Sequence, residues 1–229
     1  METDPGKVLD EAREAACNKD YPIALDRYRW FYDNALRLNE SYYGVRLSYC
    51  LMEWARLGQE FPPALEALIS LKERTLSAFR ASKSRRSFHE FASICQVLSC
   101  SEEAYQEFRV VSDKELSASL FRHVYRYCAS NGMLDICREY LDNGYSQYRE
   151  ALELLDHMLN FSNEQAEGEA RESLLHTGVV EFKREISWLL AMLRHAQALD
   201  EYESAMTVLE SDLRERKLET VFLEIKGSA

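Results

Sequence analysis

The sequence predicts an all-α protein, and three observations lead to this prediction. Only 4 prolines and 8 glycines interrupt the 229 residues, and no proline follows Pro63. Helix-forming residues such as Ala, Leu, Glu and Arg dominate throughout. Apolar residues recur at spacings of three and four, as at Leu47, Cys50, Leu51 and Trp54, and no run alternates in the manner of a strand. We therefore expect helices along the whole chain.

About twelve helices are expected, separated by polar turns and by the few prolines. Pro22 and Pro62 suit first helical positions, because the backbone N–H that proline lacks has no intrahelical partner there. Gly132 and Gly144, each after an asparagine, suit helix ends, where glycine supplies the left-handed residue. The expected spans are 6–19, 22–38, 41–58, 62–80, 84–99, 101–111, 113–130, 132–142, 145–162, 165–176, 178–199 and 202–216. An amphipathic tail, 218–225, would then cover the last helix pair.

A weak repeat runs along the chain. The segment 21–28, Tyr-Pro-Ile-Ala-Leu-Asp-Arg-Tyr, resembles the segment 61–68, Phe-Pro-Pro-Ala-Leu-Glu-Ala-Leu, 40 residues later. Six such segments share a pattern in which a small residue lies four positions before a large apolar residue, except that one segment has Ile136 at the small position. This spacing places both residues on one helix face. The first positions are Ala24, Ala64, Ala104, Ile136, Ala170 and Ala205, and the second are Tyr28, Leu68, Phe108, Tyr140, Leu174 and Leu209. Successive segments are 40, 40, 32, 34 and 35 residues apart.

This pattern resembles the tetratricopeptide (TPR) family, whose repeat is a helix–turn–helix unit of about 34 residues. The resemblance covers the chain as about six degenerate units, although nearly every unit lacks the family's glycine and its closing proline. It implies a TPR-like superhelix, an α-solenoid of about six antiparallel helix pairs, as a single domain over residues 1–229. A subdivision near 131, into 1–130 and 131–229, is the alternative organisation. A generic helical bundle also remains open, because any antiparallel helix stack packs small side chains against large ones.

The composition limits the classes of partner. With 28 Lys and Arg against 39 Asp and Glu, the formal net charge is −11, which disfavours nucleic-acid binding because phosphate contacts need surplus basic side chains. No stretch is apolar enough to predict a membrane span, and the first residues lack a signal-peptide pattern. Neither the six cysteines nor the five histidines have metal-ligand spacing. We expect a cytoplasmic protein with no cofactor, metal, membrane or nucleic-acid partner.

The acidity is concentrated in one half of the chain. Residues 131–229 hold 10 basic and 20 acidic side chains, whereas residues 81–130 hold 7 basic and 6 acidic ones. The exclusion of nucleic acid is therefore firmer for the C-terminal half than for the first 130 residues. One function left open is an acidic inhibitor or immunity-type protein, whose C-terminal half would neutralise a basic partner.

The resemblance also implies a binding groove, because tetratricopeptide arrays bind peptides along the first helices of their units. The residues that the repeat register places in this groove are mainly arginines, tyrosines and a histidine. They are Arg13, Arg46, Tyr49, Glu53, Arg86, His89 and Tyr125, together with Arg122, which lies one residue from the corresponding row. Guanidinium groups bind carboxylates through two parallel hydrogen bonds, so such a face suits an acidic or C-terminal segment of a protein partner. The alternative is that these side chains are ordinary solvated positions on helix faces.

One motif leaves an enzyme open. Arg171 and His176 fit the Arg-x4–6-His pattern of an all-α family of ribonucleases, in which both side chains act on a phosphodiester. Chance placement of 20 Arg and 5 His gives about one such match, and glutamates surround this one. The favoured expectation is therefore a protein–protein interaction module or scaffold without catalytic residues.

Overall fold

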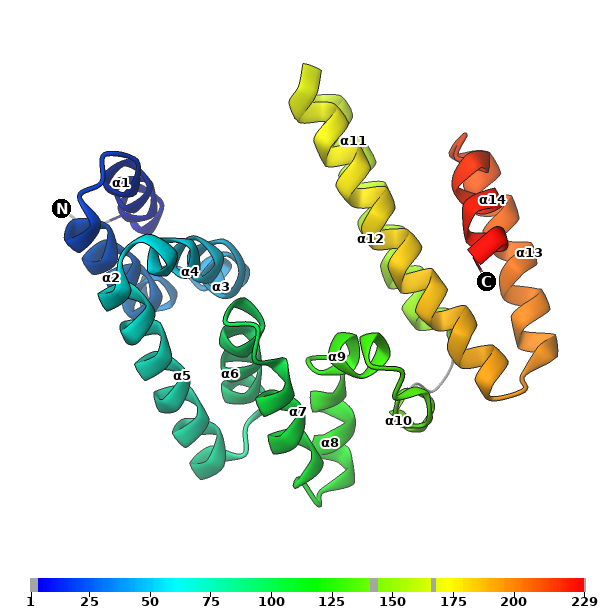
Figure 1. Cartoon of the computed structure of the whole chain (residues 1–229), viewed down its shortest axis with the longest axis horizontal. Coiled ribbons are helices and arrows are strands. Elements are labelled where there is room, and N and C mark those ends of the chain that lie inside the picture. Colours follow the sequence, from blue (N-terminus) through cyan, green and yellow to red (C-terminus); the bar gives the residue numbers. More distant parts are fainter. Residues whose placement is uncertain (1–3, 141–143, 166–167, 229) are drawn as a thin grey trace. The chain divides into compact units, whose positions relative to one another are not determined.

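The computed structural model describes residues 4–140, 144–165 and 168–228, and every regular element in these residues is helical (Figure 1). This confirms the all-α class. In chain order the elements are α1 (Pro5–Cys17), α2 (Tyr21–Leu38), the 3-10 turn η1 (Glu40–Tyr42), α3 (Tyr43–Val45), the π-helical segment η2 (Arg46–Cys50), α4 (Leu51–Glu60), α5 (Pro62–Ser82), α6 (Arg85–Val97), α7 (Ser101–Arg109), α8 (Lys114–Phe121), α9 (Tyr125–Ser130), α10 (Leu134–Tyr140), α11 (Gly144–Gln165), α12 (Gly168–His195), α13 (Leu199–Glu215) and α14 (Glu219–Ser228). None of these helices is long and apolar enough to cross a membrane.

The chain forms two compact units, Met1–Tyr127 and Cys128–Ala229. In the first unit, helices that follow one another along the chain pack together, α1 on α2, α4 on α5, α5 on α6 and α6 on α7. The second unit is organised around α12, which packs against α10, α11, α13 and α14. The predicted amphipathic tail is confirmed as α14, whose Val221, Phe222 and Ile225 are buried.

The repeat positions of the first unit are buried, as expected. The alanines at positions 24, 64 and 104 expose at most 2% of their surface, and the large residues four positions later are also buried. The large residues are Tyr28, Leu68 and Phe108. Such small side chains let the preceding helix come close. The indole N–H of Trp54 on α4 donates a hydrogen bond to the carbonyl of Ala64 on α5, at 2.9 Å.

The second unit follows the repeat pattern less closely. Leu209 is buried, but Ile136 and Ala205 are only partly buried. The side chains of Ala170 and Leu174 lie outside the described residues. Here the small-to-large spacing is therefore a weaker guide to the core than in the first unit.

Five helix-to-helix turns share one pair of backbone hydrogen bonds. At the α1–α2 turn the N–H of Asp20 donates to the carbonyl of Ala15, and that of Lys19 donates to Ala16. Lys19 is left-handed, with φ 64°, so the turn is a Schellman motif. The same pair of bonds closes the α6–α7, α9–α10, α12–α13 and α13–α14 turns. The left-handed residues there are Ser99, Gly132, Gln197 and Lys217. The predicted glycine at the helix end is confirmed for Gly132. Gly144 is instead the first residue of α11, and Asn143 before it lies outside the described residues.

Two predicted helix boundaries are wrong. The spans 165–176 and 178–199 belong to one helix, α12, so the expected fifth and sixth helix pairs share a helix. A Cβ on Gly178 would lie 3.1 Å from Cβ of Met158 on α11, so this glycine serves close helix packing and does not end a helix. Conversely, the predicted helix 113–130 is broken between α8 and α9, at residues 122–124.

We expect Lys19→Gly to stabilise the first unit. A left-handed backbone is unfavourable for an L-residue by about 1 kcal/mol, and the greater freedom of glycine in the unfolded chain offsets part of that gain. A net increase of about 0.5 kcal/mol in the free energy of unfolding should appear as a higher Tm in thermal unfolding followed by circular dichroism. Asn18→Gly is the matched control, because Asn18 has φ −78° and should lose stability. A lower Tm for Lys19→Gly would contradict this explanation of the turn.

Candidate functional site

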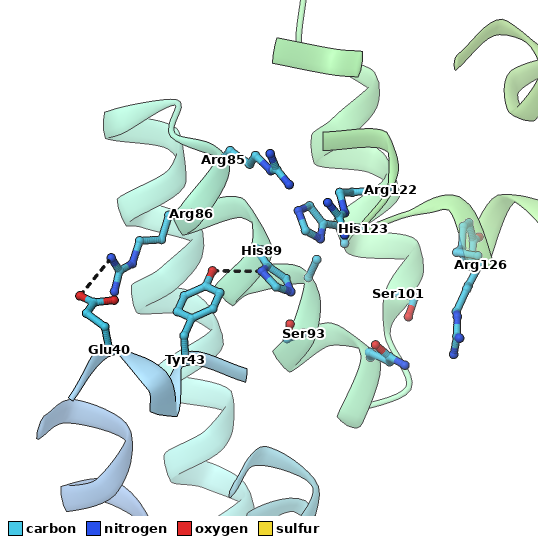
Figure 2. A pocket seen from close by; sticks show the side chains of 14 residues that line it. Glu40, Tyr43, Arg85, Arg86, His89, Ser93, Ser101, Arg122, His123 and Arg126 are labelled. Carbon is cyan, nitrogen blue, oxygen red and sulfur yellow. Dashed lines mark hydrogen bonds and ion pairs between the residues drawn. The ribbon is translucent and has the colours of Figure 1, made fainter. Parts of the chain in front are cut away.

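A pocket of about 920 Å³ lies in the first unit, bordered by η1 and α3, α6, the start of α7, and the α8–α9 turn (Figure 2). The described residues that line the pocket include four arginines, two histidines and one glutamate. They are Arg85, Arg86, Arg122, Arg126, His89, His123 and Glu40. The pocket is therefore strongly cationic, although the chain as a whole is acidic.

Helix α6 supplies one wall of the pocket because its two faces differ in polarity. Phe88, Phe91 and Cys95, at spacings of three and four, are completely buried in the core. His89 and Ser93, four residues apart on another face, line the pocket. The amphipathic pattern of α6 therefore fixes which of its side chains can meet a ligand.

The first turn of α6 carries two of the arginines. The side chain of Ser84 caps this turn by accepting a hydrogen bond from the N–H of Ser87 at 3.2 Å. Arg85 and Arg86 follow the cap, where acidic residues would be favourable because the helix dipole is positive. The N-terminus of α6 thus concentrates positive charge at the edge of the pocket.

The break between α8 and α9 brings Arg122 and His123 to the pocket. The N–H of His123 donates to the carbonyl of Leu120, and that of Val124 donates to Phe121, both at 2.9 Å. These bonds span three residues, as in a 3-10 turn, and they redirect the chain. A continuous helix over 113–130 gave no reason to expect His123 in the site, so sequence reasoning missed it.

Tyr43, His89 and His123 form a contiguous row of rings across the pocket (Figure 2). The Tyr43 hydroxyl lies 3.0 Å from Nδ1 of His89, and it donates a hydrogen bond when that nitrogen is unprotonated. The rings of His89 and His123 stack with their centroids 4.1 Å apart and an angle of 20° between planes. Within the described residues, Nε2 of His123 is buried and has no hydrogen-bond partner.

Burial and positive charge keep both imidazoles neutral at pH 7. Burial lowers the pKa of His89, and the charges on Arg122 and Arg85 lower that pKa further, whereas Glu90 opposes them. Burial also lowers the pKa of His123 to about 3, with smaller contributions from His89 and the same two arginines. The positive charge of the pocket at pH 7 therefore resides on its arginines.

The arginines differ in how their charge is balanced. Arg86 lies 3.9 Å from a carboxylate oxygen of Glu40 and 3.8 Å from one of Glu90. In the part of the chain that the structure describes, neither Arg85 nor Arg122 forms an ion pair with a carboxylate. Two guanidinium groups at the pocket are thus available to an anionic ligand.

Three of the eight predicted groove residues line this pocket, namely Arg86, His89 and Arg122. Arg13 and Glu53 instead bind each other, with Nη2 of the arginine 3.0 Å from Oε1 of the glutamate. They lie on α1 and α4, 40 residues apart, which is the spacing of the first two repeat segments in the sequence. Tyr49 is 56% exposed but does not line the pocket.

The expectation that Arg46 and Tyr125 line an open groove is wrong, because both are buried. Tyr125 packs with its ring centroid 5.9 Å from that of Phe121. Arg46 is 7% exposed, its Nε donates to the carbonyl of Tyr32 at 2.6 Å, and its Nη1 donates to Glu90 at 2.9 Å. The guanidinium also lies 3.7 Å above the Tyr32 ring.

The π-helical segment η2 explains why the repeat register misplaced Arg46. A π-helical turn holds one residue more than an α-helical turn, which rotates the preceding side chains by about 100° relative to those that follow. Arg46 begins η2, whereas α6 is α-helical throughout. A step of 40 residues from Arg46 to Arg86 therefore compares two different helix faces.

Both residues of the ribonuclease motif lie on α12. Arg171 and His176 are both exposed on α12. Five positions along an α-helix separate two side chains by about 140° around its axis, so these two point in different directions. Among the described residues, no three His, Cys, Asp or Glu side chains are grouped in a way that could hold a metal ion.

The fold and the pocket together define the class of protein, an all-helical chain with a cationic pocket in its first unit. Comparisons of the chain with protein-family models, with curated proteins and with solved structures find no match.

We expect Arg46→Met to destabilise the first unit by about 3 kcal/mol, because removing one partner of a buried ion pair leaves the other charge uncompensated. Here that charge belongs to Glu90, which among the described residues keeps only a longer contact, 3.8 Å, with the half-exposed Arg86, and the carbonyl of Tyr32 loses its donor as well. The measurement is denaturant unfolding in a Trp188→Phe background, in which the fluorescence of the two remaining tryptophans reports on the first unit.

The matched control for this measurement is Arg56→Met, because Arg56 is exposed on α4. Its free energy of unfolding should stay within about 0.5 kcal/mol of the parent. A comparably small change in Arg46→Met would contradict a structural role for the Arg46 guanidinium.

We also expect the stability of the first unit to fall between pH 7 and pH 5. The pKa of each pocket histidine is below the value of about 6.5 for an unfolded chain, so the unfolded state binds protons first as the pH falls. The stabilisation is complete above pH 6.5 and is lost progressively below it. Tm measured at several pH values should depend less on pH in His123→Gln than in the parent. The control is His176→Gln, at an exposed site on α12, whose dependence of Tm on pH should match that of the parent. If all three proteins show the same dependence of Tm on pH, His123 is not a cause of the loss of stability.

Proposed function

We propose that the protein is a non-catalytic interaction module that binds an acidic segment of a partner protein in the pocket of its first unit. One observation carries the proposal: four arginines line the pocket, and Arg85 and Arg122 are not neutralised by carboxylates of the described residues. Salt screens charges beyond about 8 Å, so these local charges govern an anion at the pocket more than the net charge of the chain.

The size and polarity of the pocket suit a short stretch of peptide. Its volume of about 920 Å³ is at the upper end of the range for small-ligand sites, enough for a few side chains. Ser93, Gln96 and Ser101 add neutral hydrogen-bonding groups beside the arginines. Guanidinium groups can then hold the carboxylates while these neutral groups bond the peptide backbone.

We further propose that the fold is a TPR-like helical repeat, and three features support this. The small and large repeat positions of the first unit are buried, Arg13 on α1 contacts Glu53 on α4, and Schellman turns join α1 to α2 and α6 to α7. In the expected register, the pocket lining comes mainly from the first helices of the second, third and fourth repeats. A groove lined in this way is where the resemblance to tetratricopeptide repeats implies peptide binding.

The proposal predicts that Arg122→Glu weakens the binding of acidic peptides at least about 10-fold, because it replaces an attraction with a repulsion. The probe is a fluorescent pool of glutamate-rich peptides with randomised flanks, in both free-acid and amidated forms, measured by fluorescence anisotropy. The parent should bind this pool, and its affinity should fall as salt is raised.

Arg56→Glu is the control for this experiment, because it makes the same charge change on an exposed face outside the pocket. It should retain the parent's affinity. If the parent fails to bind either pool at low salt, or if both variants lose affinity equally, an acidic-segment site in this pocket is excluded. Preference for the free-acid pool would assign the bound group to a peptide C-terminus.

A further inference from the structure

Arg85 and Arg122 reach the same part of the pocket from two different elements, the first turn of α6 and the α8–α9 turn. Figure 2 shows both guanidinium groups beside His123. Both guanidinium groups also lie close enough to His89 and His123 for their charges to lower the pKa of each imidazole. Two positive charges are thus concentrated in one region, and neither is balanced by a carboxylate of the described residues.

The number of charges and donors in this region exceeds what one carboxylate can use. A carboxylate carries one negative charge and two oxygens, and a single guanidinium satisfies it through a bidentate contact. A phosphate monoester carries a charge of about −1.5 to −2 at pH 7 and three terminal oxygens. Two guanidinium groups that approach from different elements match the charge of such a dianion, and together they have enough N–H donors for its three terminal oxygens.

The aromatic rings of the pocket favour a peptide over a nucleotide as the carrier of the phosphate. A nucleobase is bound by stacking on an open aromatic face. Here the guanidinium of Arg86 lies 5.2 Å from the centroid of the Tyr43 ring, and the His89 and His123 rings stack on each other. The Tyr127 ring, which also lines the pocket, packs with its centroid 5.4 Å from that of the Tyr105 ring. The pocket volume also exceeds what a single phosphate group fills, so further residues of a peptide fit beside it.

We propose that the acidic group bound in this pocket is a phosphate monoester on a peptide, so that the module selects phosphorylated segments of its partner through Arg85 and Arg122. This inference rests on the proposed function and narrows it, from any acidic segment to a phosphorylated one.

The test compares five peptide pools that differ only in their central residue, which is phosphoserine, phosphothreonine, phosphotyrosine, glutamate or serine, within the same randomised flanks. Binding to the full chain is measured by fluorescence anisotropy at one fixed salt concentration. We expect at least one phosphorylated pool to bind about 10-fold more tightly than the glutamate pool. Arg85→Gln and Arg122→Gln should each remove most of that preference, while Arg56→Gln should preserve it. Circular dichroism checks that each variant remains folded.

Each outcome has a distinct meaning. Equal binding of the glutamate pool and all phosphorylated pools overturns the phosphate inference and leaves the acidic-segment function intact. Absence of binding by every charged pool overturns both. Inorganic phosphate and a nucleoside monophosphate are added as competitors. If the nucleoside monophosphate displaces the peptide at a concentration at which inorganic phosphate does not, the site recognises nucleotides and the peptide inference is wrong. A preference for phosphorylated pools that persists in Arg122→Gln places the phosphate elsewhere.

Discussion

The buried guanidinium of Arg46 connects the elements on which the pocket depends. It joins the carbonyl of Tyr32 on α2 to the carboxylate of Glu90 on α6, and it stacks on the Tyr32 ring. Glu90 adjoins His89 in the chain and also lies 3.8 Å from Arg86. The hydrogen bond between Arg46 and Glu90 therefore helps to position α6, the helix that lines the pocket. A buried charge of this kind is tolerated only with good hydrogen bonds, which couples the geometry of the pocket to the integrity of the core.

Much of the helical architecture could be predicted from the sequence, because it depends on short-range patterns. Apolar periodicity indicated the helices, and Pro22 and Pro62 lie at helix starts as their chemistry requires. The two errors have tertiary causes. Gly178 stays inside a helix because Met158 packs against it, and the turn at residues 122–124 contains no glycine, proline or asparagine that would mark it. Neither packing partners nor a tight turn of ordinary residues can be recognised from local composition.

The same distinction explains what could be predicted of the pocket. The repeat register found Arg86 and His89, because side chains at equivalent positions of the repeat segments share a face, and it came within one residue of Arg122. It missed His123, which depends on the helix break, and it placed Arg46 on the surface because it could not include the extra residue of η2. Arg85 could have been recognised as a candidate site residue from the sequence alone. A pair of arginines directly after a serine N-cap opposes the helix dipole, and such a local conflict often marks a functional position.

The Schellman turns have a consequence for how such a chain can change over time. Four of the five turns place lysine, serine or glutamine in the left-handed position where glycine is usual. The geometry is therefore maintained by bonds from backbone N–H groups to backbone carbonyls, and residues other than glycine are accepted there at a cost of about 1 kcal/mol. A substitution at the left-handed residue can then leave the helix hairpin intact, so these turns constrain the sequence less than the buried core positions do.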